Sequence, residues 1–139
     1  KAVNGYVANI CHQQVEGYTV EDTSVCNIQF ANGTLGSICG SNCAVKNQWN
    51  GRFRVICENM VADFEDQNHA TFVFTNEDNQ RTEKISEDVD CTFEEDSYFI
   101  DTIRGKKNAM ADIFEGYQGL QLVSAVVFSS RNQGSTVTI

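Results

Sequence analysis

The last quarter of the chain, residues 112–139, constrains the fold most strongly, because it predicts a capped helix that lies across a sheet. Asp112 and Glu115 match a capping box, which places the first helical turn directly after Asp112. Leu120, Val123 and Val127 recur at intervals of three and four residues, with Leu122 and Val126 beside them, and predict a wide apolar stripe. The polar residues expected outside this stripe are Ser124, Ser129, Ser130 and Arg131.

A helix stop and an extended segment follow this helix. Gly134 lies just past the last periodic residue, where a residue in the left-handed conformation can end a helix. Residues 135–139 are rich in β-branched side chains and favour a strand. Helix, stop and strand together predict a packing unit, and none of these residues indicates chemistry.

The preceding sequence is dominated by short segments of alternating or apolar residues, separated by polar turns. The predicted strands are 3–10, 18–30, 34–41, 52–58, 61–65, 70–75 and 81–86. Short turns favour antiparallel pairing, because a parallel neighbour needs a long crossover. A second capping box at Thr92 and Glu95 predicts a helix with Tyr98, Phe99 and Ile103 inward.

The expected fold class is therefore α+β. The sequence predicts a largely antiparallel open sheet of about seven strands, with two C-terminal helices covering one face. We expect residues 1–139 to form a single domain, since 139 residues are enough to bury a core.

The composition indicates which partners the chain avoids. Its formal net charge of −9 repels phosphate backbones and anionic lipid surfaces, so we expect no nucleic-acid and no membrane partner. Three of the six cysteines, Cys26, Cys39 and Cys57, lie inside apolar strand-like segments, where a free thiol packs as a small hydrophobe. Free thiols in a chain that opens without a signal-like segment predict a cytoplasmic protein.

The sequence offers little sign of a catalytic, cofactor or metal site. His12 and His69 lie in no metal-ligand or nucleophile motif, and the pair Cys39 and Cys43 lacks the second pair that a structural zinc site needs. No glycine-rich turn joins a strand to a helix as a dinucleotide site requires. We therefore predict no catalytic residue, no cofactor-binding residue and no metal ligand within these 139 residues.

Four runs of sequence, in order, nevertheless resemble a known family. They are 20–23 (VEDT), 30–36 (FANGTLG), 99–105 (FIDTIRG) and 119–134 (GLQLVSAVVFSSRNQG). This series resembles the C-terminal α/β domain of the glucose–fructose oxidoreductase and inositol dehydrogenase (Gfo/Idh/MocA) family, over nearly the whole chain.

The resemblance implies an oxidoreductase that uses NAD or NADP and acts on a sugar, polyol or related small molecule. The nucleotide fingerprint and the catalytic lysine of the family belong to a Rossmann domain that this chain does not contain, so the cofactor would bind elsewhere in a longer protein. This chain would contribute the wall of the substrate pocket, with Asn47, Trp49 and Arg52 as candidate substrate-binding residues, and a homodimer or larger homo-oligomer contact through the open sheet face. The alternative is a stand-alone, non-catalytic α+β module that binds a ligand or a partner.

Overall fold

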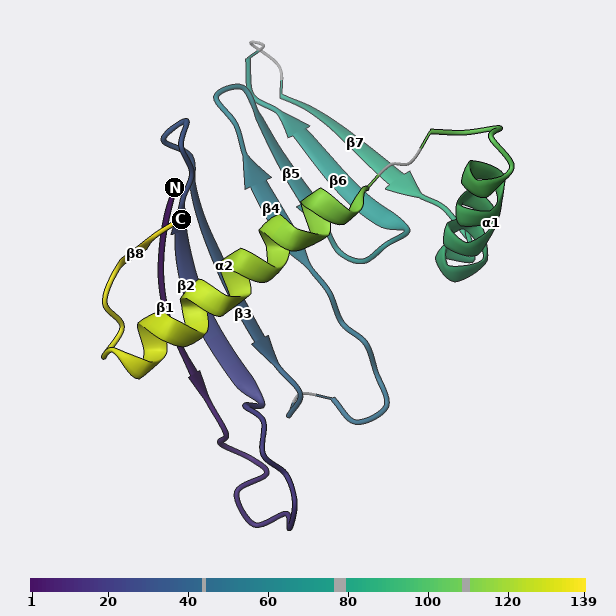
Figure 1. The fold of residues 1–139 in the computed structure, drawn as a ribbon. Coiled ribbons are helices and arrows are strands. Elements are labelled where there is room, and N and C mark those ends of the chain that lie inside the picture. The colour runs from purple at the N-terminus through teal and green to yellow at the C-terminus, as the bar shows by residue number, and fades with distance from the viewer. Residues whose placement is uncertain (44, 77–79, 109–110) are drawn as a thin grey trace. The chain divides into compact units, whose positions relative to one another are not determined.

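The computed structural model describes residues 1–43, 45–76, 80–108 and 111–139 and divides the chain into two compact units. The first unit joins Lys1–Lys46 to Met110–Ile139, and the second is Asn47–Ala109. The first unit holds the strands β1 (Ala2–Ala8), β2 (Thr23–Gln29), β3 (Leu35–Ser41) and β8 (Val137–Thr138) and the helix α2 (Ile113–Arg131) (Figure 1). The second unit holds β4 (Phe53–Ile56), β5 (Met60–Phe64), β6 (His69–Phe74), β7 (Arg81–Ser86) and the helix α1 (Cys91–Ile103).

The α+β class and the antiparallel pairing are confirmed, but the single sheet of about seven strands is wrong. The described strands form two sheets of four, in the orders β3-β2-β1-β8 and β4-β5-β6-β7. Strand pairing passes along each hairpin but not from β3 to β4, and the described residues between them, 42–43 and 45–52, form no helix or strand. Alternation and short turns predict pairing within hairpins, whereas they carry no information about two strands separated by a longer connection.

The core of the first unit lies between one face of its sheet and α2. Val3, Cys26 and Ile28 from the sheet pack with Ala125 and Val126 from the helix, and all five are buried. Val3 and Ile28 are cross-strand partners, and so are Gly5 and Cys26, which places all four on the face that α2 covers. Removing this apolar surface from water is the main stabilising contribution within the unit.

The predicted ends of α2 are confirmed. The Asp112 side chain accepts hydrogen bonds from the backbone N–H groups of Phe114 and Glu115, at 2.9 Å each. At the other end Gly134 has φ +75° and its N–H donates to the carbonyl of Ser129. Local chemistry is sufficient to fix these two positions, because each cap satisfies backbone groups that the helix itself leaves unpaired.

The predicted buried face of α2 is wrong in part. Val123 and Leu120 are exposed, whereas Ser129, expected outside the stripe, is 0% exposed. Strand β8 pairs with β1 only at Ala2 and Val3, which leaves the next edge groups of β1 without a strand partner. The Ser129 hydroxyl accepts from the Gly5 N–H at 3.0 Å, and the Ser130 hydroxyl accepts from the Val7 N–H at 3.0 Å. The two serines therefore face the sheet because they replace the missing strand at its edge.

Helix α1 begins two residues earlier than the capping box at Thr92 and Glu95 predicts. Its N-cap is Asp90, whose carboxylate accepts from the Phe93 N–H at 3.1 Å, while Thr92 lies in the first turn. None of its residues is buried, and Phe99 and Ile103 are largely exposed. The expectation that two helices cover one sheet face is therefore wrong for α1, and α2 alone provides such a cover. Gly105, the predicted stop, has φ +72° directly after the helix.

Candidate functional site

Four side chains of the first unit meet at one end of its sheet, and we name them the Asp22 cluster: Cys11, His12, Asp22 and Cys43. Cys11 and His12 follow β1, Asp22 precedes β2, and Cys43 follows β3. Because neighbouring strands are antiparallel, the end of β1, the start of β2 and the end of β3 lie at the same end of the sheet. Backbone hydrogen bonds from Asp22 N to Ala8 O and from Asn42 N to Asp22 O tie the three segments together.

The Asp22 carboxylate is the centre of this cluster, and its side chain is fully buried. One oxygen, Oδ1, accepts from the Ile10 N–H at 2.9 Å and from the Thr23 hydroxyl at 3.0 Å. The other, Oδ2, accepts from the Cys11 N–H at 2.8 Å and the His12 N–H at 3.1 Å, and it lies 3.0 Å from His12 Nδ1. The carboxylate thus gathers the backbone of residues 10–12 around one buried negative charge.

These contacts decide the protonation of Asp22. Burial alone would raise the pKa of the carboxyl group, but hydrogen bonds from the Ile10 and Cys11 N–H groups, from the His12 side chain and from the Thr23 hydroxyl hold it well below its usual range. The carboxylate is therefore ionised at neutral pH. It orients the imidazole of His12, whose ring also stacks on Tyr18 with the ring centroids 4.5 Å apart.

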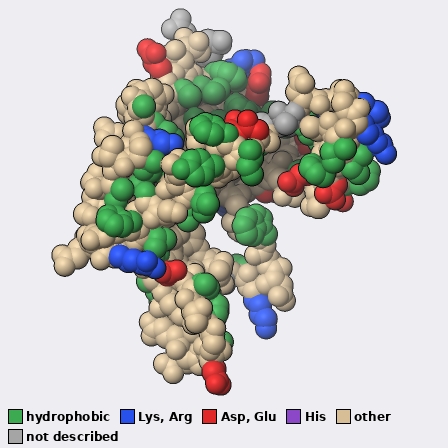
Figure 2. Space-filling model, in the orientation of Figure 1, with side chains coloured by type: hydrophobic (Ala, Val, Ile, Leu, Met, Phe, Trp, Pro, Cys, Tyr) green, Lys and Arg blue, Asp and Glu red, His purple; other side chains and the backbone are tan. Residues whose placement is uncertain are grey.

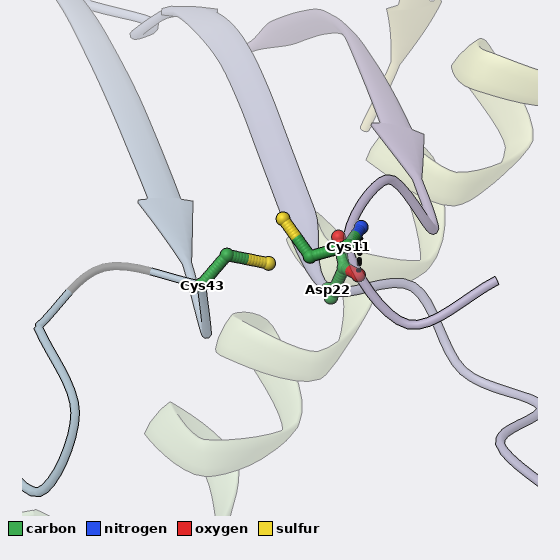
Figure 3. Close-up of side chains that lie close together, drawn as sticks. All are labelled: Cys11, Asp22 and Cys43. Carbon is green, nitrogen blue, oxygen red and sulfur yellow. Dashed lines mark hydrogen bonds between the residues drawn. The ribbon is translucent and has the colours of Figure 1, made fainter. Parts of the chain in front are cut away.

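Two thiols complete the cluster. Figure 3 shows Cys11, Asp22 and Cys43 converging from separate segments, with the Cys43 sulfur pointing toward Cys11. The two sulfurs and a carboxylate oxygen of Asp22 lie within 4.8 Å of one another, a spacing that could hold a cation. The close pair in the sequence, Cys39 and Cys43, is not the pair that meets here, because Cys39 lies within β3 and is not part of this group.

The three predicted substrate-binding residues all lie in the connection between β3 and β4. Asn47 has a left-handed backbone with φ 61°, and Trp49 is 93% exposed. Arg52 lines a shallow hollow of about 520 Å³ on the second sheet, beside Arg54, Asp63 and other residues of β4, β5 and β6. The structure therefore brings Arg52 to a hollow, whereas Asn47 and Trp49 are not among the residues that line it.

The charged pair in this hollow is Arg54 and Asp63, which are cross-strand neighbours in β4 and β5. Two guanidinium nitrogens of Arg54 contact the two carboxylate oxygens of Asp63, at 2.5 and 3.1 Å. Since Arg54 donates to Asp63, its pKa is raised and it stays charged. Both side chains are partly exposed, so the pair presents a planar polar group to solvent.

A second hollow, of about 540 Å³, lies on the first sheet and is lined in part by side chains of the face opposite α2. Asn4, Asn27 and Ser37 form one cross-strand row there, and Gln29 pairs with Leu35 in the next. Asn27 donates to the side chain of Asn4 at 3.1 Å. The lining also includes Leu35, whose large apolar side chain is 76% exposed.

Comparison with solved structures identifies the class of fold. The chain superposes over its full length on a presumed oxidoreductase, yvaA from Bacillus subtilis, with a TM-score of 0.71 and 13% identity. It also superposes over its full length on a presumed oxidoreductase from Thermotoga maritima, with a TM-score of 0.73 and 15% identity. The expected resemblance to an oxidoreductase domain is thus confirmed at the level of the fold.

A third solved structure is the WlbA dehydrogenase from Bordetella pertussis in complex with NADH and UDP-GlcNAcA, with a TM-score of 0.56 and 19% identity over the whole of this chain. The chain spans 44%, 41% and 38% of the three solved chains, which is less than half of each. No model of a known protein family matches the sequence, and no curated protein matches it either. Neither α1 nor α2, within the described ranges, has the length and apolar composition that a membrane span requires.

Proposed function

We propose that this chain is the C-terminal, substrate-side domain of an NAD(P)-dependent oxidoreductase that acts on a sugar, polyol or related small molecule in the cytoplasm. The observation that carries the proposal is the superposition of the whole chain on part of three oxidoreductase or dehydrogenase structures. One of those proteins holds NADH together with a sugar nucleotide, which supports the cofactor class and the substrate class.

The helix starts support the assignment of cofactor binding to another part of the protein. A dinucleotide site uses the free N–H groups of a helix N-terminus, reached through a glycine-rich turn, to bind pyrophosphate. Here α1 is capped by Asp90 and α2 by Asp112, and each carboxylate accepts N–H groups of its own first turn. An aspartate in this position both occupies the donors and repels a phosphate, so neither helix suits a nucleotide.

The proposed contribution to the substrate site is the segment that contains Asn47, Trp49 and Arg52. An exposed tryptophan offers an apolar face on which a sugar ring can stack, and an arginine donates to hydroxyl or phosphate oxygens in a fixed geometry. The exposure of Trp49 and the position of Arg52 in the lining of a hollow support this role.

The proposed second contribution is a subunit contact through the sheet faces. On the second sheet, Ile56, Val61 and Val73 form a cross-strand row next to Arg54 and Asp63, and Ile56 is 74% exposed. Figure 2 shows apolar side chains scattered over the visible face. A two-fold contact needs only one self-complementary patch, and this row offers apolar area with a polar rim.

We expect Ile56→Arg to weaken self-association of the chain about tenfold or more, because it places a charge in the centre of the proposed contact. Ile103→Arg is the matched control, since Ile103 is 70% exposed on α1 and lies outside the sheets. Light scattering across a range of concentrations gives the mass of the unmodified chain and of each variant. If the unmodified chain is a monomer at every concentration, the proposed contact does not exist. If the two substitutions have equal effects, the contact lies elsewhere.

A further inference from the structure

The two thiols of the Asp22 cluster are adjacent, although they lie far apart in the sequence. Cys11 is exposed and Cys43 is half-buried, so both can be reached from solvent. The Cys11 and Cys43 sulfurs lie within 4.8 Å of each other, and Figure 3 shows the Cys43 side chain extending toward Cys11. The backbone bond from Asn42 N to Asp22 O, at 2.8 Å, already holds the end of β3 against the segment that carries Asp22.

The hydrogen bonds of Asp22 argue against a metal ion as the occupant of this cluster. Its two oxygens accept from three backbone N–H groups, one hydroxyl and the His12 ring. Coordination of a cation would break several of these bonds around a buried charge. If the carboxylate is not available, only the two sulfurs of this group remain as possible ligands, whereas structural zinc sites supply four.

The surroundings give the two thiols different roles. The neighbouring Cys43 side chain, burial and the nearby charge of Asp22 raise the pKa of Cys11 to about 11, so Cys11 retains its proton at neutral pH. The Cys43 sulfur lies 4.0 Å from His12 Nδ1, and Asp22 orients this imidazole at 3.0 Å. Because Cys11 keeps its proton, Cys43 is the thiol that reacts first.

We propose that Cys11 and Cys43 form a redox-active thiol pair, which a low-molecular-weight disulfide such as oxidised glutathione converts into an intrachain disulfide. Cys43 gives its proton to solvent, and its sulfur attacks one sulfur of the small disulfide, forms a mixed disulfide and releases one small thiolate. Cys11 then gives its proton to solvent, and its sulfur attacks the Cys43 sulfur and releases the second small thiolate. Two protein thiols are oxidised, and one small disulfide is reduced to two thiols.

The test is oxidation of the reduced 139-residue chain with excess oxidised glutathione, followed by an acid quench and mass spectrometry. We expect the free thiols to fall from six to four, with a protein mass lower by about 2 Da rather than higher by added glutathione. Cleavage after Glu16 and Glu21 separates Cys11 from Cys43, so the bridge appears as two linked peptides that dithiothreitol releases.

Variants assign the pair. Cys39→Ser removes an exposed thiol of β3, close to Cys43 in the sequence, and should leave the linked peptides unchanged. Cys43→Ser and Cys11→Ser should each abolish them. Glutathione adducts without linked peptides in the unmodified chain, or a bridge that persists in Cys43→Ser, would overturn the proposal; the first result depends on no variant and so holds even if a substitution impairs folding.

Discussion

Replacing Gly5 by alanine is expected to destabilise the first unit by about 3 kcal/mol, because the sheet has no room for a side chain at this position. A Cβ atom on Gly5 would lie 2.6 Å from the carbonyl oxygen of Val25 and 2.7 Å from the Cβ atom of Cys26. Both neighbours belong to the paired strand β2, so relief requires the two strands to move apart. Such a movement would also disturb the bond between the Gly5 N–H and the buried Ser129 hydroxyl.

Gly40→Ala is the matched control on β3 of the same sheet. Its added Cβ would lie 3.6 Å from the Ser24 hydroxyl, which is an ordinary contact, and its effect should stay within about 0.5 kcal/mol. Urea unfolding of the two variants gives the comparison directly. Equal stabilities would show that β1 and β2 are not closely paired at Gly5.

The second large effect concerns Asp22, whose replacement by asparagine removes the charge but keeps the shape. The backbone N–H groups of Cys11 and His12 donate to one carboxylate oxygen of Asp22. If the amide NH₂ of asparagine takes the place of that oxygen, these two donors lose their acceptor. We expect a fall in Tm at pH 7 several times larger than that of Asp88→Asn, an exposed acidic residue of the connection before α1.

The pH dependence of this effect has a definite sign. The folded state holds the pKa of Asp22 below its ordinary value of 3.8, so the ionised carboxylate stabilises the fold above that pH. The contribution is lost as the pH falls below about 3.8 toward the lower pKa of the folded state. The difference in stability between the unmodified chain and Asp22→Asn should therefore shrink on acidification. A difference that grows as the pH falls would contradict the assignment of Asp22 as an ionised anchor.

Local chemistry in the sequence was enough to predict the ends of α2 and the hairpin between β2 and β3. The Asp112 cap, the left-handed Gly134 and the turn at Gly33, which has φ 88°, each follow from the needs of nearby backbone groups. The buried face of α2 could not be predicted in the same way. Ser129 is polar by composition, and it is buried only because β8 is two residues long and leaves the Gly5 N–H to be satisfied from the helix.

The Asp22 cluster was missed for a related reason. Cys11, His12 and Cys43 belong to no motif, and they meet only because three antiparallel strand ends share one end of the sheet. Antiparallel pairing of the first three predicted strands is enough to bring these ends together, because the end of the first strand then lies beside the start of the second and the end of the third. By contrast, the polar loop around the sole tryptophan predicts Asn47, Trp49 and Arg52 as substrate-binding residues, and that role remains a prediction.

The most direct test of the proposed function compares cofactor binding by the full reading frame that contains this chain with binding by the 139 residues alone. Calorimetric titration with NADH should give micromolar binding for the full-length protein and none for the isolated chain, because the nucleotide site is assigned to the other domain. Micromolar binding of NADH by the isolated chain would contradict the proposal that the nucleotide binds outside these 139 residues. A full-length protein that binds neither NADH nor NADPH would contradict the oxidoreductase assignment and favour a stand-alone binding module.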